Sequence, residues 1–149
     1  MKKLFEKYKF GIDFWGLILF ALIMLPTIVY LCIPGLGKIS SSYVGLDVSS
    51  KVFQVIAVAL LILVVRKERA KFSLTRPLVF FAGIFLMLYY IAWIFFFCGY
   101  GNSADLLFLA VCPCVSLLLY EIEGKNWFAL CPTAIFAILH VVSTLLLFV

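Results

Sequence analysis

Residues 66–76, Arg-Lys-Glu-Arg-Ala-Lys-Phe-Ser-Leu-Thr-Arg, form the densest run of positive charge in this 149-residue chain. They contain five of its twelve basic residues and one acidic residue, and long apolar segments lie on both sides. Short loops rich in Lys and Arg stay on the cytoplasmic side of a membrane. We therefore predict that this run is a cytoplasmic loop, and its side determines the side of every other loop.

The composition also indicates a membrane protein. The chain is 66% hydrophobic with a mean hydropathy of +1.23, and 13% of its residues are charged. Soluble domains carry roughly 25% charged residues, so lipid has to be the solvent for most of this apolar surface. The net charge of +5 comes mainly from short segments beside apolar runs. This placement indicates topogenic charge and contact with anionic lipids, and it argues against a nucleic-acid partner.

A transmembrane helix needs roughly 20 mainly apolar residues. We predict an all-α, polytopic bundle of five transmembrane helices that forms a single domain over residues 1–149. The expected spans are 11–33, 48–66, 77–98, 104–120 and 127–149. Asp13 can cap the first helix, and Pro26 inside it frees the carbonyl of Leu22.

The second span has the weakest signal, because only residues 52–65 are strictly uncharged. We extend it outward with Lys51 reaching to the interface, and Asp47 or Ser49 can cap it. Residues 66–71 favour helix, so the helix can continue inward through them. In contrast, residues 121–126 are expected to form a short inner loop.

The charges agree on one orientation. Ten basic residues lie before the first span, between the second and third, or between the fourth and fifth, and two, Lys38 and Lys51, lie on the other side. This bias places the N-terminus in the cytoplasm and the C-terminus outside.

Two stretches, residues 7–15 (KYKFGIDFW) leading into 25–27 (LPT), and residues 126–133 (NWFALCPT) leading into His140, resemble a group of small bacterial membrane proteins. Those proteins have the same length and loop pattern, and the resemblance covers the whole chain. It implies a multi-pass protein of the bacterial cytoplasmic membrane, and it implies no particular chemistry.

Polar and aromatic side chains of several spans fall in the outer half, and His140 lies there at a level similar to Cys112 and Cys114. A helix rises 1.5 Å per residue, which places His140 about 14 Å below the outer edge of the fifth span. An ionisable group inside a span has to face protein or water and marks a candidate site. The candidate ligand-binding residues are His140, Tyr89, Tyr90, Trp93, Gln54, Thr27 and Thr144. The leading hypothesis is a protein that binds or passes a small ligand through an outward-facing pocket, as a monomer or a homo-oligomer.

Two other hypotheses remain open. In the first, the protein is a structural or regulatory subunit whose polar residues only form hydrogen bonds between helices. In the second, Cys112 and Cys114, with His140, hold a soft metal or carry out thiol chemistry. Cys112-Pro113-Cys114 is similar to the Cys-Pro-Cys of heavy-metal transport ATPases, and the two thiols converge only if Pro113 breaks the fourth span. The simpler interpretation is two small apolar cysteines.

Catalysis finds little support in the sequence. His140 has no second histidine and no acid within a span to pair with, and no phosphate loop or dinucleotide motif is present. We expect no cofactor, and no residue pair argues for an intramembrane enzyme. Ala129, Thr133 and Ala137 recur every four residues, which predicts a close helix contact along the fifth span.

Overall fold

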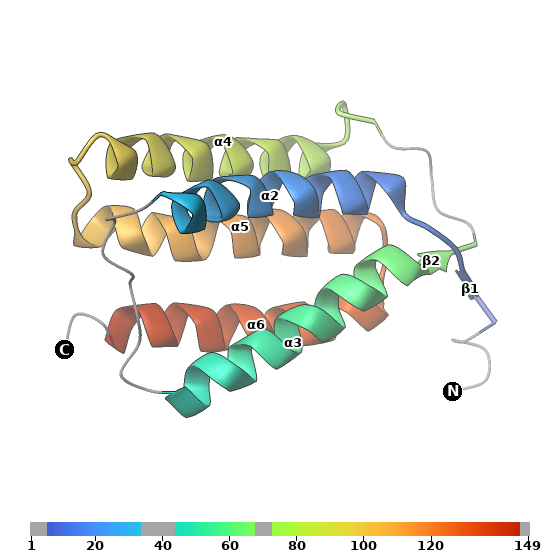
Figure 1. Cartoon of the computed structure of the whole chain (residues 1–149). Coiled ribbons are helices and arrows are strands. Elements are labelled where there is room, and N and C mark those ends of the chain that lie inside the picture. Colours follow the sequence, from blue (N-terminus) through green and yellow to red (C-terminus); the bar gives the residue numbers. More distant parts are fainter. Residues whose placement is uncertain (1–5, 34–43, 68–72, 147–149) are drawn as a thin grey trace.

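The computed structural model describes residues 6–33, 44–67 and 73–146. Within them, five helices run back and forth along one axis (Figure 1). They are α2 (Phe14–Cys32), α3 (Val44–Leu63), α4 (Pro77–Phe97), α5 (Ser103–Glu123) and α6 (Trp127–Leu145). All five are long and apolar enough to cross a membrane, which confirms the predicted all-α bundle. The exceptions are two three-residue strands, β1 (Tyr8–Phe10) and β2 (Val64–Arg66).

The helix ends follow from local side-chain chemistry. Asp13 caps α2 as predicted, because its carboxylate accepts the backbone N–H of Gly16 at 3.1 Å. Pro77 begins α4, where a missing N–H costs nothing. Asn102 and Asp105 form a reciprocal capping box at the start of α5. These caps set where the helices begin.

The helices pack as two close pairs. α4 runs along α5 and α3 runs along α6, while α5 also packs on α6; α2 lies against the bundle with far fewer contacts (Figure 1). Between α4 and α5 the hydroxyl of Ser116 donates to the carbonyl of Ala82 at 2.9 Å. On α6, Ala129 and Thr133 of the predicted small-residue stripe are buried, and Ala137 is half-buried.

The C-terminal end of α3 differs from the prediction. β1 pairs antiparallel with β2, with Tyr8 opposite Arg66. Below this pairing, the N–H groups of Gly11 and Asp13 donate to carbonyls of the last turn of α3. The N-terminal segment therefore forms hydrogen bonds with those carbonyls and pairs with β2, and α3 ends at Leu63. The predicted helix is therefore wrong over residues 64–66, and its predicted continuation is wrong at Lys67, which lies in a turn. Residues 68–71 lie outside the described part of the chain.

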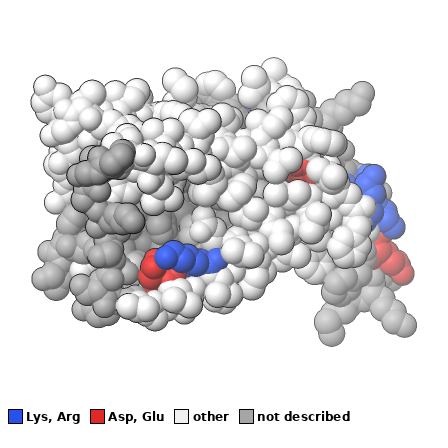
Figure 2. All heavy atoms as spheres, in the orientation of Figure 1, with Lys and Arg blue, Asp and Glu red and all other residues white. Residues whose placement is uncertain are grey.

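β1, β2 and the α5–α6 turn lie together at one end of the bundle, on the right in Figure 1. We call it the inner end, because its basic residues predict that it faces the cytoplasm. The opposite end, with the α4–α5 turn, is the outer end. Figure 2 shows charged atoms at the inner end and one blue and red group over the first turns of α3, with an almost entirely white surface between them.

Three other local predictions need correction. Asp47 lies in the first turn of α3 and Ser49 lies inside that helix, so neither precedes it as a cap. Pro113 does not break α5, which is continuous from Ser103 to Glu123. Glu121, expected in the inner loop, belongs to the last turn of α5 and is buried.

Candidate functional site

A cavity of about 370 Å³ lies in the outer half of the bundle, between all five helices. Small-molecule sites typically measure roughly 300–1,000 Å³. Six of the seven candidate ligand-binding residues line it: Thr27, Gln54, Tyr89, Trp93, His140 and Thr144. We call this cavity the outer pocket.

Tyr90 is the exception. Its hydroxyl donates to the carbonyl of Leu22 at 2.8 Å, the carbonyl that Pro26 leaves without an N–H partner in α2. Tyr90 thus satisfies a backbone group on the outside of the pocket and does not line it. Its neighbour Tyr89 donates to the next carbonyl, that of Ile23, at 2.8 Å, and it does reach the pocket.

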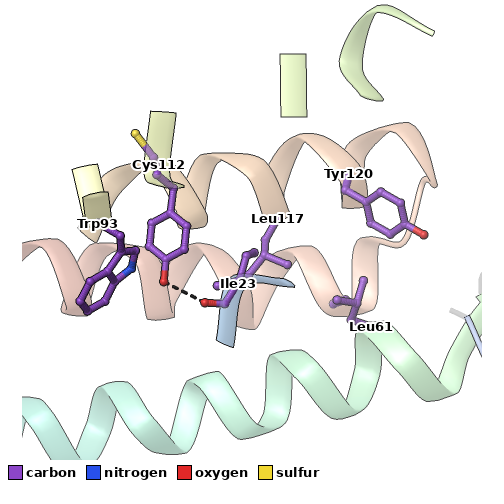
Figure 3. Packing of buried hydrophobic residues seen from close by; sticks show 8 residues of the cluster. Ile23, Leu61, Trp93, Cys112, Leu117 and Tyr120 are labelled. Atoms are coloured by element: carbon purple, nitrogen blue, oxygen red, sulfur yellow. Dashed lines mark hydrogen bonds between the residues drawn. The ribbon is translucent and has the colours of Figure 1, made fainter. Parts of the chain in front are cut away.

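An aromatic wall closes one side of the outer pocket. Trp93 contacts Tyr30 and Tyr89 with ring-centroid distances of 5.7 and 6.3 Å. Figure 3 shows the indole beside the tyrosine whose hydroxyl bonds to the carbonyl of Ile23. Trp93 is 8% exposed, and among the described residues no acceptor has hydrogen-bond geometry to its indole N–H. The indole nitrogen itself is buried, so the wall presents mainly aromatic surface to the pocket.

His140 lines the pocket from α6. Its ring stacks on Phe136 with a centroid distance of 5.2 Å and an interplanar angle of 19°. The hydroxyl of Thr144 donates to the backbone carbonyl of His140 at 2.9 Å, so this threonine is satisfied within its own helix. The imidazole is held by stacking, and its nitrogens are available to a ligand as donor and acceptor.

A charged pair marks the rim. Lys51 Nζ lies 2.6 Å from an Asp47 carboxylate oxygen, and the two side chains are 68% and 44% exposed. Both residues line the pocket, and they lie one turn apart on α3. An exposed pair of this kind contributes little stability, so its location at the rim is the more informative property.

The inner side of the outer pocket, which we call its floor, is apolar. Phe20, Ile23, Val58 and Leu117 line the inner side of the cavity. Further inward the bundle is solid, and Leu61 and Tyr120 are 2% and 3% exposed in the cluster shown in Figure 3. The lining of the outer pocket thus ends near the middle of the bundle.

The two cysteines of the Cys-Pro-Cys motif do not join this site. Cys112 and Cys114 are 1% and 2% exposed and lie outside the pocket lining, to which Pro113 and His140 contribute. The helix between them is unbroken. Within the described ranges, no three His, Cys, Asp or Glu side chains gather as a metal site would require. The structure therefore gives the soft-metal hypothesis no support.

Sequence reasoning missed a polar cluster at the inner end. The hydroxyl of Tyr120 donates to Asp13 at 2.9 Å, and that of Thr133 donates to Glu121 at 2.7 Å. All four residues are buried. Glu121 resembled a loop residue because it follows the apolar run. Glu121 follows Leu117 by four residues and therefore lies on the same buried face of α5. This spacing was the signal in the sequence that could have predicted its burial.

The chain matches no known family model, and no curated protein or solved structure is significantly similar to it. Its class follows from the fold itself, since five helices of membrane-spanning length and composition define a polytopic membrane protein. The chemistry of the site has to be inferred from its geometry.

Proposed function

We propose that this protein binds a small, mainly apolar ligand in the outer pocket, on the outer side of the bacterial cytoplasmic membrane. The observation that carries the proposal is one cavity of about 370 Å³ that brings together side chains from five separate helices. Concave, mostly apolar sites with a few convergent polar groups are typical ligand sites. The side and the membrane follow from the distribution of basic residues and from the resemblance to small bacterial membrane proteins.

The shape of the pocket favours binding over passage. A route across the membrane requires a lining that continues to the inner end, whereas the inner half is filled by buried side chains such as Leu61 and Ala129. The inner end is also tied together, because the Asn126 amide donates to the carbonyls of Leu60 in α3 and Val64 in β2. A ligand that enters from the outer side meets this packed layer and stops.

The lining specifies the chemistry of the ligand. Ile23, Val58 and Leu117 accept an apolar body on the floor. Trp93 adds aromatic surface, and the His140 imidazole supplies a donor and an acceptor. The ligand should therefore carry at least one hydrogen-bond acceptor next to an apolar part.

The structural or regulatory alternative has one observation in its favour. Tyr90 and Ser116 use their hydroxyls to bond backbone carbonyls of neighbouring helices, as polar residues that only join helices do. Both lie outside the pocket lining. The alternative therefore accounts for these residues and leaves the cavity unexplained.

The test is ligand-dependent stabilisation of the purified chain in micelles, with a matched pair of variants on α3. Gln54→Trp places an indole into the pocket, and Val55→Trp places it on the adjacent position, which is 68% exposed. A ligand at 100 times its Kd stabilises the native state by about 2.7 kcal/mol. We expect small apolar compounds to raise the melting temperature of wild type and Val55→Trp but not of Gln54→Trp. Equal shifts in all three proteins would contradict the proposal.

A further inference from the structure

The rim of the outer pocket lies on a face that is turned to lipid. Lys51 shares one face of α3 with Val48, Val52 and Val55, at the three- and four-residue spacing of a helix surface. These valines are 53%, 51% and 68% exposed. Figure 2 shows the blue and red group on the flank of the bundle and not at its tip. The charged rim therefore opens sideways, toward the bilayer.

α2 and α3 diverge toward the outer end of the bundle (Figure 1). At the inner end the two helices approach closely, since a Cβ on Gly16 would lie 3.2 Å from the Leu61 side chain. Toward the outer end α3 slants away from α2 (Figure 1). There, side chains such as Met24 and Gln54 line the cavity from opposite sides.

The pocket has the length and the polarity of one membrane leaflet. From Tyr30 to Phe20 the lining of α2 spans about 15 Å at 1.5 Å per residue, which is half of a ~30 Å hydrocarbon core. The charged groups, Asp47 and Lys51, lie at the outer end of this span, and the apolar floor lies at the other.

The energetics select an occupant that already resides in the bilayer. An empty apolar cavity loses dispersion contacts with every missing neighbour, so a cavity open to lipid is filled by a hydrocarbon chain. Lipid tails are as apolar as the floor, and the chain itself gains little by entering. Selectivity has to come from the head. Lys51 has three donors, and Asp47 uses one of them.

We infer that the ligand of the outer pocket is a single-chain amphiphile of the outer leaflet, with an anionic carboxylate or phosphate beside Lys51 and its chain on the floor. This inference rests on the proposed function. A fatty acid and a lysophospholipid share the required chemistry. The anion takes the two donors of Lys51 that Asp47 leaves unused.

Photo-crosslinking of the full chain in nanodiscs tests the inference. The probes are a fatty acid and a lysophosphatidylethanolamine, each with a diazirine near the end of the chain. We expect the label on floor residues such as Phe20, Val58 and Leu117, and competition by the unlabelled compound. Label spread evenly over lipid-facing residues of α4, such as Met87 and Ile94, would show annular lipid only and overturn the inference.

The two probes differ in head group, and this distinguishes the source of the anion. Lys51→Gln should reduce floor labelling by about tenfold for whichever probe is native, since a charge-assisted bond is worth roughly one factor of ten or more. Val52→Gln, one residue further along α3 and 51% exposed, is the control and should change nothing. If neither probe loses labelling in Lys51→Gln, the assigned head-group site is wrong.

The experiments distinguish a wrong amphiphile assignment from a wrong proposed function. One outcome is evenly spread labelling, together with small compounds that stabilise wild type but not Gln54→Trp. It would support ligand binding in the outer pocket and contradict the amphiphile as the ligand. Random labelling with no stabilisation by any compound would reject both.

Discussion

Thr133→Val removes one hydroxyl from the inner end while nearly conserving the shape of the side chain. The Thr133 hydroxyl donates to Glu121 Oε1 at 2.7 Å, and both residues are 1% exposed. The second carboxyl oxygen of Glu121 is buried and has no hydrogen-bond partner among the described residues. The variant therefore leaves a buried carboxyl group without its donor.

The expected loss is about 2 kcal/mol in the free energy of unfolding. Stranding a buried polar group costs about 1–3 kcal/mol, whereas side-chain bonds between membrane helices average about 0.6 and reach about 1.7 kcal/mol. The near-complete burial of both partners places this pair at the upper end of the second range. A double variant, Glu121→Met with Thr133→Val, replaces both partners by apolar groups and should recover most of the loss.

Thr144→Val is the matched control on the same helix. The Thr144 hydroxyl bonds the carbonyl of His140 within α6, so its loss strands no other side chain. We expect a change within about 0.5 kcal/mol. Denaturant unfolding in mixed micelles measures wild type, these two single variants, Glu121→Met alone and the double variant. The reasoning is refuted if Thr133→Val costs no more than Thr144→Val, or if the double variant loses at least the sum of its two single variants.

Three other predictions concern packing and topology. Gly16→Val should destabilise the protein by about 2 kcal/mol through overpacking, and Gly83→Val, where a new Cβ meets nothing within 4 Å, should not; equal melting temperatures would contradict this. Tyr90→Phe should cost about 1 kcal/mol in unfolding free energy, because its carbonyl acceptor on α2 loses the one side-chain donor that it has among the described residues. An unchanged denaturant midpoint would contradict this. Cysteines introduced at Ser103 and Ser73 should react with an impermeant thiol reagent from outside and inside, respectively, and labelling of position 73 from outside would contradict the orientation.

The five helices could be predicted because a bilayer imposes length and composition on whatever crosses it. Uncharged runs of about 20 residues leave few other structures available. The fixed helical rise also predicted that His140, Trp93 and Gln54 lie in the outer half of their spans. All three line the outer pocket.

The direction of each side chain was not predictable from depth. Tyr89 and Tyr90 are adjacent, and one residue step turns a helix by about 100°. Only the packing of α4 against α2 decides that Tyr89 reaches the pocket and Tyr90 meets the carbonyl of Leu22. Since all faces of α4 are apolar, the sequence contains no amphipathic stripe that would orient it.

The inner end was harder to predict for a different reason. β1 pairs with β2 across more than fifty residues of sequence, and such non-local pairing has no local signature in three-residue strands. Glu121 follows an apolar run, where an acid normally marks the end of a span. Its burial depends on Thr133, which arrives only when α6 packs on α5.

The cavity itself calls for an explanation in terms of stability. An empty cavity costs about 24 cal/mol per Å³, so roughly 370 Å³ left empty corresponds to about 9 kcal/mol. A whole domain is stable by only about 5–15 kcal/mol. The lining includes Ala57 and Ala110, whose small side chains contribute little to filling the space. The inner end is held together by the Asp13–Tyr120 and Glu121–Thr133 hydrogen bonds, whereas the outer half keeps a cavity of this size. The proposed ligand accounts for this difference, because it would restore the contacts that the cavity lacks.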